Sequence, residues 1–227
     1  MSLINQLLNN KTPSNSHEIK YFVRTTENRI FEYDLNYKKL IDTEHKPVQS
    51  FIAQLKYISQ WDSVLLEDDL ILCENFQEEI EKVIAQYPNK IINFFTRPRD
   101  YFTTHENSMF AYNQCTYYPK GMAHKLAEQM ELGMRRNPRA QYDILESNAL
   151  RELGWSHVQY RPCLVQHLDL NSLVGNYADG HRRCPYYIDY LKTLKIDLSD
   201  AFEPRNRVSL ERMMDEHIKE WRAKNLK

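Results

Sequence analysis

The chain has 227 residues with 30 basic and 31 acidic side chains, and this net charge of −1 argues against a general binder of polyanions. Its hydrophobic content of 42% and charged content of 27% are those of an ordinary water-soluble globule with one large domain or two small ones. Only five glycines are present, and none completes a G-x-G-x-x-G pattern or a P-loop, which argues against the usual glycine-based phosphate sites.

The first half of the chain alternates short apolar runs with amphipathic stretches, which is the pattern of an α/β protein. In chain order, the expected elements are strands at 20–25 and 30–33, a helix beginning at Pro47, a strand at 63–66, a helix from Phe76 to Tyr87 ended by Pro88, and a strand at 91–95. The strands are short and rich in β-branched and aromatic residues, whereas the helices have apolar residues at intervals of three and four.

The second half continues the same alternation. In chain order, we expect an aromatic-rich strand at 109–118, helices at 120–132 and 143–153, short strands at 157–160 and 163–166, a long polar loop at 171–185 and an amphipathic C-terminal helix. No internal repeat or low-complexity linker is present. We therefore expect an N-terminal segment at 1–19, one α/β domain at 20–200, and a C-terminal amphipathic helix within 201–227 that packs on it.

The four cysteines are far apart in sequence and form no C-x-x-C pair, which argues against a zinc ribbon or a redox motif and favours reduced thiols. The N-terminus has no basic region followed by an apolar run, and nowhere do about 18 apolar residues follow one another. We therefore expect no membrane span and a cytoplasmic location, or the host cytoplasm if the protein is viral.

The strongest charge asymmetry lies between Asp62 and Glu81, where eight acidic residues occur and no basic one. Glu67, Asp68 and Asp69 end a hydrophobic strand, at the kind of sheet edge where α/β proteins present ligands. A divalent cation would relieve the repulsion between these carboxylates, and oxygen ligands favour magnesium, manganese or calcium over zinc. The alternative is a solvated turn, but the buried strand before the triplet favours a metal site.

The segment 63–70, followed by Glu74-Asn-Phe76, resembles the hhhEDDh…F segment of glycosyltransferases with the GT-A fold, particularly the lipopolysaccharide and collagen-type galactosyltransferase group. In that family the last carboxylate of this D-x-D-like motif binds a metal that bridges the diphosphate of a nucleotide sugar. Further segments resemble the family in the same order, namely 20–29, 47–55, 116–126, 141–146 and 162–167 with Asn171-Ser172. The resemblance implies a GT-A-like, Rossmann-related mixed sheet flanked by helices, with a C-terminal helical tail.

The resemblance also implies roles for particular residues. Asp69 and His167 are the expected ligands of Mn²⁺ or Mg²⁺, with Glu67 either supporting the ligands or contacting the ribose. The candidate donor-binding residues are Arg24, Thr25, Arg29, Glu67 and Asp68. The interval between Arg29 and Pro47 is too short for the second strand and helix that family members usually insert near the base and ribose. Either the donor is recognised differently, or the fold is a trimmed version of the family's.

Asp143 is the candidate general base, because an inverting sugar transfer needs a group that accepts the proton of the acceptor hydroxyl. With Glu146 three residues later, it also fits a helix N-cap in a capping-box-like pattern, and both roles are compatible only if the side chain points into the cleft. The candidate acceptor-binding residues are Tyr118, in the segment that frames the acceptor side, and Arg182 and Arg183, in the long polar loop.

The sequence therefore predicts a metal-dependent transferase that moves a sugar from a nucleoside-diphosphate sugar, with a UDP-sugar favoured, to an acceptor hydroxyl with inversion. The acceptor is a saccharide, or a hydroxymethylated base in DNA, because arginine and tyrosine are concentrated in the second half of the chain. The main alternative is a non-catalytic carbohydrate- or nucleic-acid-binding module. Phosphoryl transfer at a carboxylate-bound metal is a third hypothesis. It is disfavoured because no basic residue occupies a phosphate-loop position.

Overall fold

The computed structural model describes residues 18–27, 31–43, 46–95, 105–106, 110, 112–168, 184, 187–195 and 204–225. In chain order, its elements are β1 (Lys20–Thr25), β2 (Tyr37–Ile41), α2 (Pro47–Ile58), β3 (Ser63–Glu67), β4 (Leu70–Leu72), α3 (Phe76–Gln86), β5 (Ile91–Asn93), β6 (His105–Glu106), β7 (Cys115–Tyr118), α4 (Met122–Arg136), α5 (Tyr142–Glu152), β8 (His157–Gln159), β9 (Val165–His167), α6 (Ile188–Leu194) and α7 (Pro204–Asn225).

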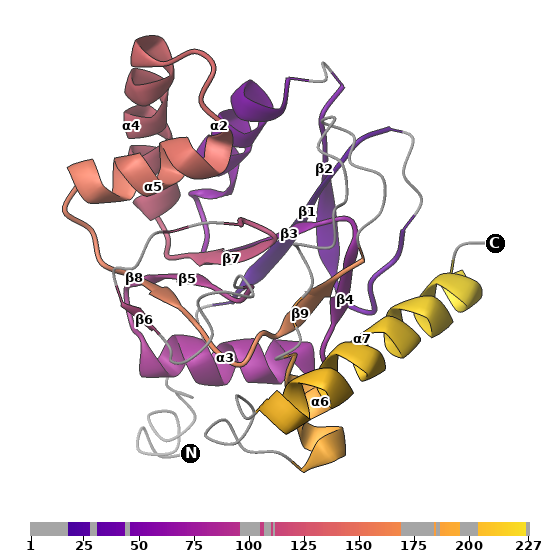
Figure 1. Ribbon diagram of the computed structural model, residues 1–227. Helices are drawn as coiled ribbons and strands as arrows, with labels where there is room; N and C mark the ends of the chain where they lie inside the picture. The colour runs from indigo at the N-terminus through magenta and orange to yellow at the C-terminus, as the bar shows by residue number, and fades with distance from the viewer. Residues whose placement is uncertain are drawn as a thin grey trace, which may run out of the picture.

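The main sheet has the strand order β2-β1-β3-β7-β5-β8-β6 in the described residues. Strand β1 pairs in parallel with both β2 and β3, whereas β7 runs antiparallel to its neighbours β3 and β5. A separate two-stranded sheet pairs β4 with β9. With helices on both sides of the main sheet (Figure 1), the prediction of an α/β protein with a mixed sheet flanked by helices is confirmed.

Alternating side chains of the central strands divide the core between the two faces of the sheet, as the strand period of two requires. On one face, Phe22 and Leu65 pack with α2, α4 and α5. On the other face, Tyr21 and Val64 pack with α3, α6 and α7. In the described residues, helices therefore pack on both faces of the sheet.

The second strand lies later in the chain than the sequence predicts. The described part of 30–33 is not a strand, and β2 occupies Tyr37–Ile41 instead. Phe31, Tyr33 and Tyr37 pack their rings together, with centroids 5.3–5.9 Å apart, so the predicted run forms an aromatic cluster rather than a ladder. The interval that was expected to be too short for a strand and a helix thus holds a second parallel strand, so the expectation was wrong for the strand, whereas no helix occurs in its described residues.

Other differences concern short elements. Strand β4 and helix α6 were not predicted, and the expected strand at 109–118 is a strand only at Cys115–Tyr118 in its described part. The C-terminal helix is present as α7, and its residues Leu210, Met214 and Ile218 are buried in the core on the α3 side. Most of the predicted loop at 171–185 lies outside the described residues. Among the helices that are described, none has the length and apolar character needed to cross a membrane.

Candidate metal centre

The parallel pairing of β1 and β3 gathers polar side chains at one edge of the main sheet. Arg24 lies opposite Glu67 in the register of the two strands. Thr25 is the last residue of β1, and Asp68 and Asp69 directly follow the last residue of β3, so these three residues lie at the same edge. The carboxyl ends of neighbouring parallel strands are where α/β sheets usually present their ligands.

The small sheet brings a histidine to this edge from almost 100 residues further along the chain. In the antiparallel register of β4 and β9, His167 lies opposite Leu70, the residue after Asp69. The backbone N–H of Leu168 also donates to the carbonyl oxygen of Asp69 at 2.8 Å. The pairing therefore fixes the backbone of β9 beside the acidic turn.

Glu67, Asp69 and His167 form a compact cluster in which one ligand atom of each residue lies within 4.8 Å of the others. The Nε2 atom of His167 is 3.4 Å from Asp69 Oδ1 and 3.8 Å from Glu67 Oε2. Two ligand atoms held at about 2.1 Å from one ion lie about 3–4 Å apart, so these distances fit a shared cation. A possible acidic metal-binding group is thus present, and it includes Glu67 as well as the two ligands implied by the resemblance.

The cluster is shielded from solvent. The side chains of His167, Asp69 and Glu67 are 2%, 8% and 13% exposed. Buried carboxylates need an ion or a charge partner to offset the loss of hydration. Of the three side chains, that of Glu67 is the most exposed.

Arg24 lies beside the cluster, with its Nη2 atom 3.8 Å from Glu67 Oε1. Its guanidinium carbon is 4.4 Å from the ring centroid of Tyr142 and 5.0 Å from that of Phe51. Burial opposes the positive charge, but contacts with Tyr142 and Glu67 outweigh it and raise the pKa of Arg24 above its ordinary value. Arg24 therefore keeps a fixed positive charge beside the carboxylates.

Two further residues that the sequence did not single out support Glu67. The hydroxyl of Tyr142 donates to Glu67 Oε1 at 3.1 Å. The hydroxyl of Tyr33 donates to the carbonyl oxygen of Glu67 at 2.7 Å and accepts from the backbone N–H of Leu70 at 3.0 Å. Because Tyr33 spans the turn between β3 and β4, it holds the backbone that carries Asp68 and Asp69.

Replacing Tyr33 with phenylalanine tests this support. The change leaves the N–H of Leu70 without its hydroxyl partner, and we expect the free energy of unfolding to fall by about 1–3 kcal/mol. Tyr37→Phe is the matched control, because Tyr37 belongs to the same aromatic cluster and its hydroxyl makes no hydrogen bond in the described structure. Urea unfolding of both variants measures the effect, and equal losses would show that the hydroxyl of Tyr33 has no special role.

Two further candidate donor-binding residues, Thr25 and Asp68, contact each other. The hydroxyl of Thr25 donates to Asp68 Oδ2, and both side chains are buried. This bond orients Asp68 toward β1 rather than toward the cluster of Glu67, Asp69 and His167. The donor candidate Arg29 lies outside the described residues, as do the acceptor candidates Arg182 and Arg183.

The capping-box interpretation of Asp143 and Glu146 was wrong. The residue that precedes helix α5 is Gln141, and Asp143 lies in the first turn with Oδ1 accepting from the backbone N–H of Ile144 at 2.8 Å. Asp143 is half-buried and follows Tyr142, which contacts Glu67. The candidate base therefore lies at the start of α5, next in sequence to a residue that contacts Glu67.

Glu146 faces the sheet instead of the helix terminus and is fully buried. Its Oε1 atom accepts from the hydroxyl of Tyr118 at 2.7 Å, and its Oε2 atom accepts from the side-chain amide of Asn113. Burial raises the pKa of Glu146 to about 8, an effect that these hydrogen bonds only partly offset. Tyr118, a candidate acceptor residue, is only 1% exposed, so its hydroxyl serves this internal contact.

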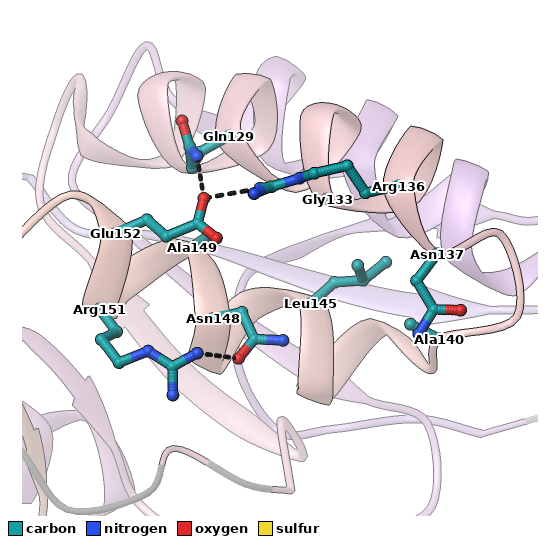
Figure 2. Close-up of a pocket in the computed structure, with 10 residues that line it drawn as sticks. All are labelled: Gln129, Gly133, Arg136, Asn137, Ala140, Leu145, Asn148, Ala149, Arg151 and Glu152. Atoms are coloured by element: carbon teal, nitrogen blue, oxygen red, sulfur yellow. Dashed lines mark hydrogen bonds and ion pairs between the residues drawn. The ribbon is translucent and has the colours of Figure 1, made fainter.

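Two cavities are described in the structure, and neither is lined by Glu67, Asp69 or His167. A hollow of about 210 Å³ lies between α4 and α5, where Glu152 accepts from Gln129 and Arg136 (Figure 2). Gly133 allows the two helices to approach there, since an added Cβ would lie 3.1 Å from Leu145. A cavity of about 610 Å³ lies between β4, the start of α3 and helices α6 and α7. The first is a consequence of helix packing.

Comparison with protein family models and with curated proteins finds no match for the chain. The function is therefore inferred from the fold and from the cluster of Glu67, Asp69 and His167.

Proposed function

We propose that the protein is a metal-dependent glycosyltransferase that takes a sugar from a nucleoside-diphosphate sugar. The observation that supports this most is the cluster of Glu67, Asp69 and His167 at the carboxyl edge of β1 and β3, with Arg24 beside it. A mixed sheet with helices on both faces is also compatible with the GT-A-like fold that the sequence resembles.

The ligand set favours manganese or magnesium. Two carboxylates and one imidazole offer three donor atoms, and a six-coordinate ion would retain open positions for phosphate oxygens. Carboxylates suit Mg²⁺ and Mn²⁺, while an imidazole ligand shifts the preference toward a transition metal, so Mn²⁺ is the better fit. When bound, such an ion stabilises the negative charge that develops on the leaving diphosphate.

Arg24 and Asp143 would provide the remaining functions. The fixed charge of Arg24 is suited to a phosphate of the donor, and the rings of Phe51 and Tyr142 restrict the orientation of its guanidinium group. Asp143 would accept the proton of the acceptor hydroxyl as that oxygen attacks the anomeric carbon, which is the role that an inverting transfer requires. Tyr142 connects the candidate base to the proposed donor site, because it is adjacent to Asp143 in sequence and contacts both Arg24 and Glu67.

Asp143→Asn separates this role from binding. The amide oxygen still accepts from the N–H of Ile144, so α5 should keep its first turn. We expect kcat to fall about 10²- to 10⁴-fold, because an amide cannot take up the proton, while the affinities for metal and donor stay within about twofold. Steady-state kinetics together with calorimetric titration of the donor measure both quantities. A kcat close to that of the wild type would exclude Asp143 as the base.

The acceptor is a hydroxyl of a saccharide or of a hydroxymethylated base in DNA. A salt titration distinguishes them, because DNA binding releases counterions and weakens steeply with salt, whereas binding of a neutral saccharide does not. If transfer to hydroxymethylated DNA is observed and its KM does not change between 50 and 200 mM salt, backbone recognition of DNA is excluded.

Analysis of the products tests the reaction class. The full-length protein is incubated with UDP-, GDP- and CMP-sugars and Mn²⁺, and the products are separated by chromatography. Release of a nucleoside diphosphate (or monophosphate, from a CMP-sugar) together with sugar supports the proposal. Release of inorganic phosphate indicates phosphoryl transfer instead, and no turnover of any donor, with or without candidate acceptors, favours a binding module.

A further inference from the structure

Two buried cysteines that are 21 positions apart meet inside the protein. The Sγ atoms of Cys163 and Cys184 lie 2.6 Å apart, and both residues are fully buried. A disulfide bond is about 2.05 Å long, so the two sulfur atoms are within about 0.6 Å of bonding distance. Cys73 and Cys115, the other two cysteines, are buried as well.

Backbone contacts hold each cysteine in place. Cys163 forms a β-bridge with Tyr187, and its carbonyl oxygen accepts from the N–H of Ile188 at 3.0 Å. The N–H of Cys184 donates to Gln166 Oε1 at 3.1 Å. The two thiols are therefore aligned by bonds on both sides of the contact, rather than by the chance position of one side chain.

The pair is also connected to the metal cluster. Gln166, which accepts from Cys184, donates through Nε2 to the carbonyl oxygen of His167 at 2.9 Å. His167 lies within the chain segment that Cys163 and Cys184 delimit. A covalent link between the two cysteines would restrict the backbone that carries this histidine.

We propose that Cys163 and Cys184 are a disulfide site whose oxidation cross-links the segment carrying His167. The thiols exchange with a small-molecule disulfide such as oxidised glutathione. The bond between the two glutathione sulfurs breaks, the bond between the protein sulfurs forms, and the two electrons and two protons pass to two molecules of reduced glutathione. The proposal does not depend on the sugar-transfer activity, since it concerns only the cysteines and the backbone between them.

Thiol counting with peptide mapping tests the proposal. The reduced full-length protein is incubated in a buffer with oxidised and reduced glutathione, quenched with acid, unfolded and reacted with a maleimide. We expect two of the four cysteines to stay unlabelled and one cross-linked peptide to contain Cys163 and Cys184. Because both thiols are buried, a second sample is oxidised while it refolds from denaturant, so that access does not limit the reaction.

Three variants provide matched controls. Cys163→Ser and Cys184→Ser should each keep all three remaining thiols reactive after oxidation. Cys73→Ser, which removes a buried cysteine outside the pair, should keep only one. Oxidation should raise the thermal midpoint of the wild type by about 5 °C or more, because the cross-link restricts the unfolded chain, and dithiothreitol should reverse the shift.

Two results would overturn the proposal: four reactive thiols in wild type after both treatments, or a cross-linked peptide that joins a different pair. If a serine variant does not fold, the peptide map of the wild type still gives the answer. Failure of this test leaves the proposed metal site intact, since the cluster of Glu67, Asp69 and His167 does not involve a sulfur atom.

Discussion

The variant Asp69→Asn should lose metal-dependent turnover of the sugar donor almost completely. The neutral amide would replace one of the two carboxylates proposed to bind the metal, a side chain whose Oδ1 atom lies 3.4 Å from His167 Nε2. Loss of a residue that merely orients a metal ligand typically costs about 10- to 100-fold in affinity or activity, and loss of a ligand itself should cost more. We therefore expect a fall of at least about 10³-fold in kcat/KM, measured as release of nucleoside diphosphate at a fixed Mn²⁺ concentration.

The matched control is Glu81→Gln, which removes a carboxylate from the exposed face of α3 within the same acidic stretch of sequence. This variant should keep wild-type kinetics, because Glu81 lies outside the cluster. A similar loss in both variants would indicate a nonspecific effect of charge. Full activity of Asp69→Asn would remove Asp69 from the metal site.

The second large effect is on stability, at Glu146. Its folded-state pKa of about 8 lies above the ordinary value of 4.5, so between these pH values the folded protein holds a proton that the unfolded chain has released. The stabilisation is complete below about pH 4.5 and is lost as the pH rises through about 8. The full shift corresponds to about 5 kcal/mol, which is a large part of the stability of a typical domain.

Glu146→Gln mimics the protonated carboxyl group and should remove this pH dependence. The side-chain carbonyl of the glutamine accepts from Tyr118, and rotation of the Asn113 amide by half a turn presents an oxygen to the new NH₂ group. We expect the variant to match the wild type near pH 5 and to exceed its free energy of unfolding by several kcal/mol near pH 9. Urea unfolding at intervals of one pH unit gives both curves.

Glu152→Gln on the same helix is the control with the opposite sign. Glu152 is exposed, and hydrogen bonds from Arg136 and Gln129 lower its pKa. Its contribution to stability is therefore constant above about pH 5 and is lost only at more acidic pH. Between pH 6 and 9, this variant should run parallel to the wild type. A wild-type curve that does not fall relative to Glu146→Gln would show that Glu146 is ionised in the folded protein.

Much of the fold could be predicted from local sequence patterns. The apolar run before Glu67 and the one-sided stripe after Pro47 correspond to β3 and α2, because both elements bury a face that the sequence periodicity reveals. The edge strand β2 was misplaced because Lys38 and Lys39 are exposed and the strand lacks apolar alternation. Strand β4 has only three residues, and its partner β9 is distant in sequence, so no local pattern announces it.

The candidate site could be predicted only in part, because some of its contacts join segments that are distant in sequence. Asp69 and His167 were proposed as ligands from the acidic triplet and from the resemblance, and their proximity depends on the register of β4 and β9. The contribution of Glu67 to the cluster, and the support it receives from Tyr33 and Tyr142, depend on contacts between distant segments. In the sequence, Tyr33 is one of several aromatic residues in a run that was predicted to be a strand. Nothing in that pattern indicated its contact with Glu67.

The proposed function requires the cluster of Glu67, Asp69 and His167 to hold a divalent ion that in turn binds a nucleoside diphosphate. Calorimetric titration of UDP into the protein, with Mn²⁺ and with a chelator, tests it most directly. We predict that Mn²⁺ tightens UDP binding at least about tenfold, that UDP tightens Mn²⁺ binding by the same factor, and that Asp69→Asn removes both effects. UDP binding of equal affinity with and without Mn²⁺ in the wild type would contradict the account.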